Sequence, residues 1–399
     1  MTSTIVLPRQ IPLWLCPELL GEYLSYIHGV DLDACSQVCH YWSEPAKMAR
    51  FRVIDVDDSA QLILLESNPH HLLYVHCIIG NIGSAFASAI SSYPIHLRSL
   101  EIRGYDLVMT GDRMNQAIVA FSRTITAFTI HNCLRMSYPA FHGLLQSLTH
   151  CKLLEKLTLP SPARILDENL SLEQRAEEAN AAFQMLPRGA EDRVKLAFMQ
   201  LIPNSYRHDP QCAHNPAMKT PHTWEYEWLD LRICPFDLHE LATLVIGSAR
   251  AAEILLPRVS EHLTRLQFCL PFDNYSSWKH YEYLRRSPII LSSLKHLGLT
   301  FHIRPSKYIL NIIRAPAIKT IHLEWNTSIS YSTYELQFRL IDRQISRLDD
   351  GHVFPRHLSN IHLVTMLCPD APWCAQAFPL CSFFGVNVSS YASTSTQTL

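Results

Sequence analysis

Four residues that could bind zinc lie close together in the sequence, namely His208, Cys212, His214 and His222. Imidazole nitrogens and thiolate sulfurs are the usual protein ligands of Zn²⁺, and four of them complete a structural site. The gaps between these residues match no standard zinc finger, and a chain with 21 histidines produces such groups by chance. We therefore predict no metal site and no cofactor.

The sequence carries no recognisable catalytic motif. His239-Glu240-Leu241-Ala242-Thr243 begins like the zinc-binding helix of a metalloprotease but lacks the second histidine. Gly80-Asn81-Ile82-Gly83-Ser84 has the wrong spacing for a dinucleotide-binding loop and the wrong context for a nucleophilic serine. We predict that the protein is not an enzyme. An enzyme with dispersed catalytic residues is the alternative that motifs leave open.

Trp224-Glu225-Tyr226-Glu227-Trp228 alternates aromatic and acidic residues, which is typical of a strand with one aromatic face. That face is either part of the core or a contact for a basic protein segment, and both interpretations stay open. The acidic neighbours make it a poor phosphate-binding site.

The composition excludes several classes of protein. The chain has 399 residues, with 34 basic and 36 acidic side chains, and the formal net charge of −2 argues against nucleic-acid binding. Hydrophobic residues make up 48% and charged residues 18%, which excludes a mainly disordered chain. The length predicts more than one domain, or one domain with an elongated array.

We also expect no membrane association and no export. The most apolar stretches are too short to span a bilayer or contain charged residues, and the beginning of the chain lacks the layout of a signal peptide. The 12 cysteines are scattered and lie mostly in apolar runs, as reduced, buried thiols do. These features predict an intracellular protein, cytoplasmic, nuclear or both.

The first fifty residues show two helical stripes. Pro17 suits the first turn of a helix, and apolar residues follow at helical spacing as far as Ile27. We expect Gly29 to end this helix and Asp31 to cap the next one. We expect Pro45 to end the second helix, before a short turn and an extended run. So few residues cannot bury both stripes among themselves, so another surface must cover them.

These residues resemble an F-box. The resemblance rests on Leu15-Cys16-Pro17-Glu18-Leu19-Leu20, then Leu24 and Ile27, then Asp31-Leu32 and Val38-Cys39-His40-Tyr41-Trp42. It covers about residues 13–50, with departures from the family pattern at Cys16, Tyr23 and His40. The alternative is a generic helical pair that packs on its own downstream domain.

The F-box resemblance implies a partner and an interface. The partner would be the small Skp-type adaptor of a cullin–RING ubiquitin ligase. The adaptor-binding residues that the resemblance implies are Leu15, Pro17, Glu18, Leu19, Leu20, Leu24, Val38 and Trp42.

The rest of the chain repeats the pattern apolar-x-x-apolar-x-apolar. A strand and a helix per unit bury a face only by stacking on the next unit, so this pattern indicates an irregular solenoid and resembles a degenerate leucine-rich-repeat array. A compact α/β domain is the alternative. The repeats are Leu97/Leu100/Ile102, Ile125/Phe128/Ile130, Leu154/Leu157/Leu159, Leu263/Leu266/Phe268, Leu294/Leu297/Leu299, Ile318/Ile321/Leu323 and Leu358/Ile361/Leu363, with a weaker member at Leu72/Val75/Cys77.

The predicted fold is therefore α/β, with a short N-terminal helical F-box-like segment (11–50) followed by an irregular leucine-rich-repeat-like α/β solenoid (51–388). Residues 160–223 lack the repeat and are expected to form an insertion. The small, polar residues 389–399 are expected to form a disordered tail.

The two resemblances together predict a substrate-recognition subunit of an SCF-type E3 ubiquitin ligase. The F-box-like helices would bind the Skp-type adaptor, and the repeat region would bind a target protein that the sequence does not identify. The alternative is a repeat-type protein-binding scaffold without ligase association.

Overall fold

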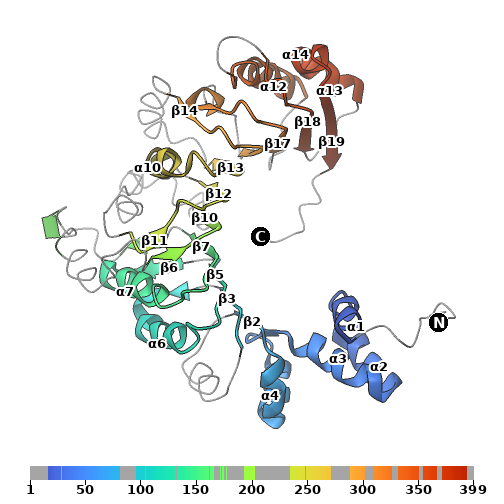
Figure 1. The fold of residues 1–399 in the computed structure, drawn as a ribbon, viewed down its shortest axis with the longest axis vertical. Coiled ribbons are helices and arrows are strands. Elements are labelled where there is room, and N and C mark those ends of the chain that lie inside the picture. Colours follow the sequence, from blue (N-terminus) through green and yellow to red (C-terminus); the bar gives the residue numbers. More distant parts are fainter. Residues whose placement is uncertain are drawn as a thin grey trace. The chain divides into compact units, whose positions relative to one another are not determined.

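The computed structural model shows a mixed α/β chain (Figure 1). It describes residues 17–27, 29–80, 96–103, 105–131, 133–160, 162–165, 171, 173–174, 177, 193–202, 234–247, 249–270, 288–301, 309–325, 331–349, 354–365 and 371–392. The chain divides into two compact units, Met1–Glu101 and Ile102–Leu399.

The first unit begins with three helices. They are α1 (Pro17–Leu24), α2 (Gly29–Val38) and α3 (His40–Phe51). Their apolar stripes meet in a small core, and an ion pair between Arg50 and Asp33 joins α3 to α2. The predicted start at Pro17 is confirmed.

Two expected helix boundaries are wrong. Gly29 begins α2 instead of ending α1, and Asp31 lies in the first turn of α2, where its charge suits the helix dipole. Pro45 lies inside α3 and ends no helix. The break between α2 and α3 falls at Cys39, whose extended backbone (φ −165°) interrupts the helical path six residues earlier than expected.

The rest of the first unit is a short α/β segment. It contains β1 (Val53–Asp55), α4 (Ser59–Ser67), the 3-10 helix η1 (Pro69–Tyr74) and β2 (Cys77–Gly80), and β3 (Ser99–Ile102) crosses the unit boundary. The pairing of β1 with β2 is parallel. Gly80 has φ +121°, and a Cβ there would lie 2.7 Å from Val56, so no other residue fits without strain.

The second unit is built on a large parallel sheet. Its strand order is β5-β7-β10-β12-β13-β15-β17-β18-β19, so neighbours in space follow one another along the chain. The strands are β5 (Ala127–Ile130), β7 (Lys156–Pro160), β10 (Phe198–Ile202), β12 (Thr243–Ile246), β13 (Arg265–Leu270), β15 (His296–Phe301), β17 (Thr320–Trp325), β18 (Asn360–Thr365) and β19 (Asn387–Ala392).

Helices connect several of these strands. They are α6 (Leu107–Ala120), α7 (Tyr138–Leu148), α10 (Ala249–Val259), α12 (Tyr331–Ile345), α13 (Ala371–Ala377) and α14 (Pro379–Phe383), with the 3-10 helix η8 (Ile309–Ile312). Figure 1 shows α6, α7 and α10 on the same side of the strands. At the start of α7, the Ser137 hydroxyl accepts the Ala140 N–H at 3.4 Å, which caps the helix.

Short outer strands form three further parallel sheets. The strands β4 (Tyr105–Asp106), β6 (Cys133–Met136) and β8 (Pro162–Ile165) pair with one another. The pair β9 (Val194–Lys195) and β11 (Phe236–Asp237) and the pair β14 (Ile289–Ile290) and β16 (Ile313–Arg314) form the other two.

One hydrogen-bond pattern recurs where the main strands begin. The Thr264 carbonyl accepts the N–H groups of both Lys295 and His296, at 2.9 and 3.0 Å. The Lys295 carbonyl in turn accepts those of Lys319 and Thr320, at 2.9 and 3.1 Å. The residue before each strand therefore lies directly beside its equivalent in the next strand.

Each of the seven clear triplets has all three apolar residues buried, with the first lying two positions before a strand of the main sheet and the other two lying on that strand. In the weaker triplet, Leu72 and Val75 are buried but Cys77 is only half-buried. The pattern at β2 starts three residues later, with Val75 before the strand and Ile78 on it. Three more segments with the same pattern, which the sequence analysis did not count, form β1, β10 and β12. They are Phe51/Ile54/Val56, Leu196/Met199/Leu201 and Leu241/Leu244/Ile246.

Two expected domain features are corrected. Residues 160–223 are not wholly an insertion, because β10 lies between β7 and β12 in the main sheet. The expected tail from Ser389 is wrong as far as Ala392, because these residues belong to β19, which pairs with β18. This polar segment has few apolar side chains to bury, but backbone hydrogen bonds to β18 hold it in the sheet.

Candidate interaction surfaces

The predicted adaptor-binding residues have different environments. Leu20 and Leu24 are buried, Trp42 is half-buried and Val38 is exposed. Pro17, Glu18 and Leu19 lie in α1, where the structure describes the backbone alone, and Leu15 lies outside the described residues. Among the predicted residues whose side chains the structure describes, Val38 is therefore the exposed one.

The core of the helical segment explains this distribution. Leu20, Leu24, Leu32 and Ala46 form a buried cluster, and Trp42 packs against it. The expectation that both apolar stripes need a foreign cover is wrong for these residues, because a third, longer helix supplies the missing surface. Leu20 and Leu24 hold the helices together and offer no surface to a partner.

Among the described side chains of residues 20–51, five large hydrophobic ones lie exposed on these helices or in the turn after α1. They are Tyr23, Tyr26, Val38, Tyr41 and Met48, which we call the apolar surface. Tyr26 is 82% exposed and Val38 is 63% exposed. Single exposed hydrophobic residues are ordinary, whereas several on one small segment indicate a contact surface.

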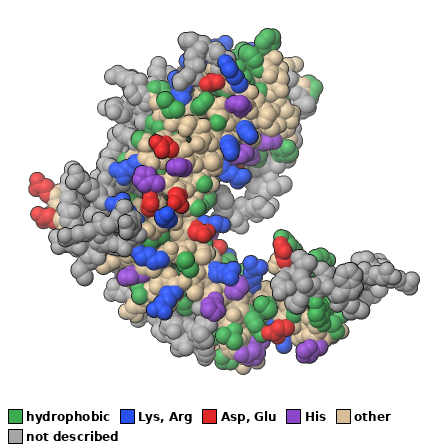
Figure 2. All heavy atoms as spheres, viewed as in Figure 1, with side chains coloured by type: hydrophobic (Ala, Val, Ile, Leu, Met, Phe, Trp, Pro, Cys, Tyr) green, Lys and Arg blue, Asp and Glu red, His purple; other side chains and the backbone are tan. Residues whose placement is uncertain are grey.

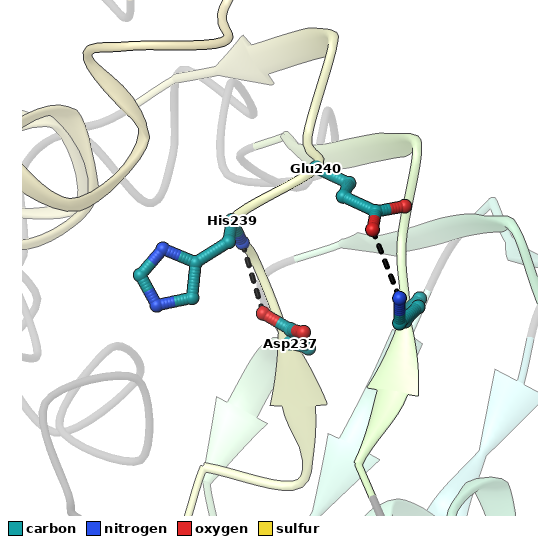
Figure 3. A network of polar contacts seen from close by, with 4 residues as sticks. Asp237, His239 and Glu240 are labelled. Carbon is teal, nitrogen blue, oxygen red and sulfur yellow. Dashed lines mark hydrogen bonds and ion pairs between the residues drawn. The ribbon is translucent and has the colours of Figure 1, made fainter. Parts of the chain in front are cut away.

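The His239–Glu240 segment lies in a turn after β11 and not on a helix (Figure 3). The His239 N–H donates to the Asp237 carboxylate at 3.0 Å. Glu240 pairs with Lys195 at 2.9 Å, and this hydrogen bond raises the pKa of Lys195. These contacts join the turn to β9, so the segment has a structural role and no geometry for a metal.

The other sequence candidates cannot be placed. The group His208, Cys212, His214 and His222 and the segment 224–228 lie outside the described residues. Within the part of the chain that the structure describes, no group of three or more His, Cys, Asp or Glu side chains could hold a metal ion.

A polar face lies on the second unit, on the strand positions between the buried apolar residues. It consists of Gln267, Thr300, His322, Glu324, His362 and Ser389, which we call the polar face. Gln267 donates to the Thr300 hydroxyl at 3.3 Å, and this hydroxyl donates to Glu324 at 3.1 Å. Farther along, His362 Nδ1 lies 2.9 Å from the Ser389 hydroxyl.

Gly298 makes room for this network. A Cβ at this position would lie 3.0 Å from Gln267 Cγ and 3.3 Å from its Cβ. The Gln267 side chain therefore lies close over the backbone of β15, from which it reaches Thr300.

Burial controls the protonation of two groups near this network. Burial raises the pKa of the Cys269 thiol to about 11, with Thr300 lowering it and Glu324 raising it. Burial lowers the pKa of His322, and the charge on His362 lowers it further, while Glu324 opposes both effects. A thiol that stays protonated at neutral pH is a poor nucleophile, so the arrangement suits hydrogen bonding better than covalent chemistry.

Basic side chains gather where β13, β15 and β17 begin. They are Arg265, Lys295, His296 and Lys319, which we call the basic edge. Partial burial lowers the pKa of His296, and the charges on Arg265, Lys295 and Lys319 lower it further. Figure 2 shows Lys, Arg and His side chains close together over the region of these strands.

The sequence analysis named none of the residues on these two surfaces of the sheet. The signal was present at the x positions of the triplets, since Lys295 and His296 separate Leu294 from Leu297. Their side-by-side placement depends on strand register, which the triplets alone do not specify.

The fold defines a mixed α/β protein with a large, mostly parallel sheet. Compared with models of known protein families and with curated proteins, the chain matches none. Within the described ranges, no helix combines the length and the apolar character needed to cross a bilayer.

Proposed function

We propose that this protein is the substrate-recognition subunit of an SCF-type E3 ubiquitin ligase. Helices α1–α3 bind the Skp-type adaptor, and the repeat region, leucine-rich-repeat-like in its pattern, binds a target protein. The protein performs no bond chemistry itself and acts in the cytoplasm, the nucleus or both.

The observation that carries the proposal is the apolar surface on α1–α3. Leu20 and Leu24 stabilise the segment from within, so Tyr26 and Val38, which remain exposed, can contact a partner. Tyr26 and Val38 lie near the C-terminal ends of α1 and α2, within the stretch that resembles an F-box. This surface revises the interface that the resemblance implies, by replacing Leu20 and Leu24 with exposed neighbours.

The sheet supports the second half of the proposal. Triplets at successive strands bury their apolar residues and leave polar side chains aligned on the polar face. Repeat proteins use such rows of variable side chains to bind other proteins. With α1–α3 bound to the adaptor and the repeat region bound to the target, the target would be held at high effective concentration near the activated ubiquitin.

The experiment is co-purification of the full chain with a Skp-type adaptor. Val38→Asp combined with Tyr26→Asp should lower adaptor recovery by about tenfold or more, because charge would enter an apolar interface. Ile63→Asp on α4 is the matched control, because Ile63 is 64% exposed and Val38 is 63% exposed.

Equal adaptor recovery with the double variant and the control would contradict the proposed docking surface. Absence of any adaptor from a native purification would favour a repeat-type scaffold without ligase association.

A further inference from the structure

The basic edge brings positive charges from three separate segments into one place. Arg265 and His296 are direct partners on β13 and β15, and neighbouring strands in a sheet lie about 4.8 Å apart. Lys295 and Lys319 precede β15 and β17 at equivalent positions, where the Lys319 N–H donates to the Lys295 carbonyl at 2.9 Å. Two exposed ammonium groups therefore extend from adjacent backbone positions.

In the described part of the chain, no carboxylate pairs with the three permanent charges of this edge, which are those of Arg265, Lys295 and Lys319. The three charges that act on His296 are all positive. Such a cluster raises the energy of the free protein and attracts an anion, which would reduce the repulsion.

The same positions on β7, β10 and β12 do not repeat this cluster of charges. In β7 the position equivalent to Arg265 is Lys156, and the residue before it is Glu155. In β10 and β12 the residues before the strands are Ala197 and Ala242. The basic edge is therefore a local feature of β13, β15 and β17.

The polar face decides which kind of anion fits. Glu324 lies four residues after Thr320 on β17, which places it roughly 13 Å along the strand from the basic edge. A nucleic-acid strand laid across the sheet would bring its phosphates close to this carboxylate. A protein segment can place one or two anionic side chains at the edge and offer polar groups to the half-buried Gln267 and Ser389.

We propose that the basic edge binds an acidic segment of the target protein, with its anionic side chains between Lys295, Lys319 and Arg265. This inference rests on the proposed function and specifies the chemistry of the target. The anionic group is a carboxylate or a phosphorylated side chain, since both form charge-assisted hydrogen bonds with ammonium and guanidinium groups.

Fluorescence anisotropy of the full chain with labelled synthetic probes tests this inference. The probes are a short peptide of alternating glutamate and serine, the same peptide phosphorylated on its serines, an alternating lysine–serine peptide and a single-stranded oligothymidylate. The two acidic peptides should bind and the lysine peptide should not. The tighter of the two identifies carboxylate or phosphate as the preferred group.

Charge reversal locates the binding. Lys295→Glu combined with Lys319→Glu should weaken binding of the acidic peptide by about tenfold or more. Arg265→Glu should weaken it severalfold, whereas its matched control Lys156→Glu should change it less than about twofold. Thermal unfolding of each variant verifies the fold. Each variant should also recover the adaptor as well as the unaltered chain does, because the basic edge is not part of the proposed docking surface on α1–α3.

Three results would overturn the inference. They are failure of both acidic peptides to bind, equal binding by the double variant and the unaltered chain, and oligothymidylate binding that equals peptide binding and depends on the same lysines. Loss of the adaptor with retained peptide binding would reject the proposed ligase function alone.

Discussion

The carboxylate of Asp342, on α12, accepts the backbone N–H of Cys381, on α14, at 3.0 Å. Its second oxygen accepts the N–H of Leu380 at 2.8 Å. Asp342 is almost completely buried, and these bonds satisfy both of its oxygens. Phe338, one turn earlier on α12, packs against Phe378, the residue that precedes α14, with ring centroids 5.1 Å apart. This apolar contact joins α12 to the start of α14.

Removal of this carboxylate should destabilise the C-terminal end of the second unit. Asp342→Ala leaves the buried N–H of Cys381 and the part-buried N–H of Leu380 without their acceptor, and we expect a loss of about 3 kcal/mol in the free energy of unfolding. Arg343→Ala, at the exposed neighbouring position, is the control and should change it by less than about 0.5 kcal/mol. Urea unfolding measures both, and similar values would show that Asp342 does not anchor α14.

His142 should make the protein sensitive to acid. Burial on α7 lowers the pKa of this imidazole from 6.5 to about 4. As the pH falls below 6.5, the unfolded chain binds a proton at this site that the native state does not bind, so stability falls until the pH reaches about 4. The full loss corresponds to about 3 kcal/mol.

The pH dependence of unfolding tests this expectation. His142→Leu should flatten the decline in stability over that window, whereas His239→Gln, in the exposed turn after β11, should leave it unchanged. An equally steep decline in the His142→Leu variant would assign acid sensitivity to other groups.

In α1–α3, substitution of a buried residue should lower stability, whereas substitution of an exposed residue should not. Leu24 is fully buried in the cluster of α1–α3, so Leu24→Ala should cost about 3 kcal/mol through the lost contacts and the cavity. Val38→Ala, at an exposed position, should cost less than about 0.5 kcal/mol.

Hydrogen exchange of the amides in residues 17–51 reports this difference locally. Faster exchange with Leu24→Ala and unchanged exchange with Val38→Ala are expected. Equal acceleration by both substitutions would mean that Val38 belongs to the core.

The strands were the most predictable part of the fold. A triplet such as Leu294/Leu297/Leu299 predicts a strand because alternate side chains of an extended chain point to opposite faces, and only one face is buried here. β10 was missed, because Met199 stands where other triplets carry Leu, Ile or Phe, and its segment follows a charged stretch. At β2, the pattern was matched three residues too early, because apolar residues are dense around Val75.

The boundaries of the N-terminal helices were less predictable. The expected end at Pro45 follows from local propensity, since proline removes a hydrogen bond from a helix interior. Burial of Pro45, Ala46 and Phe51 outweighs that cost and keeps α3 continuous. The same packing buries Leu20 and Leu24, which local pattern assigns equally well to a core or to an exposed stripe.

The amino-acid sequence by itself determined the α/β class, the start of α1 and most strands of the sheet, because periodicity and proline act within a few residues. Tertiary structure decided which side chains meet. Lys295 and Lys319 are 24 residues apart in sequence but adjacent in space, because the Lys319 N–H donates to the Lys295 carbonyl at 2.9 Å. Strand register and the stacking of successive repeats determine which residues become neighbours. Both depend on the whole folded sheet and not on any one repeat.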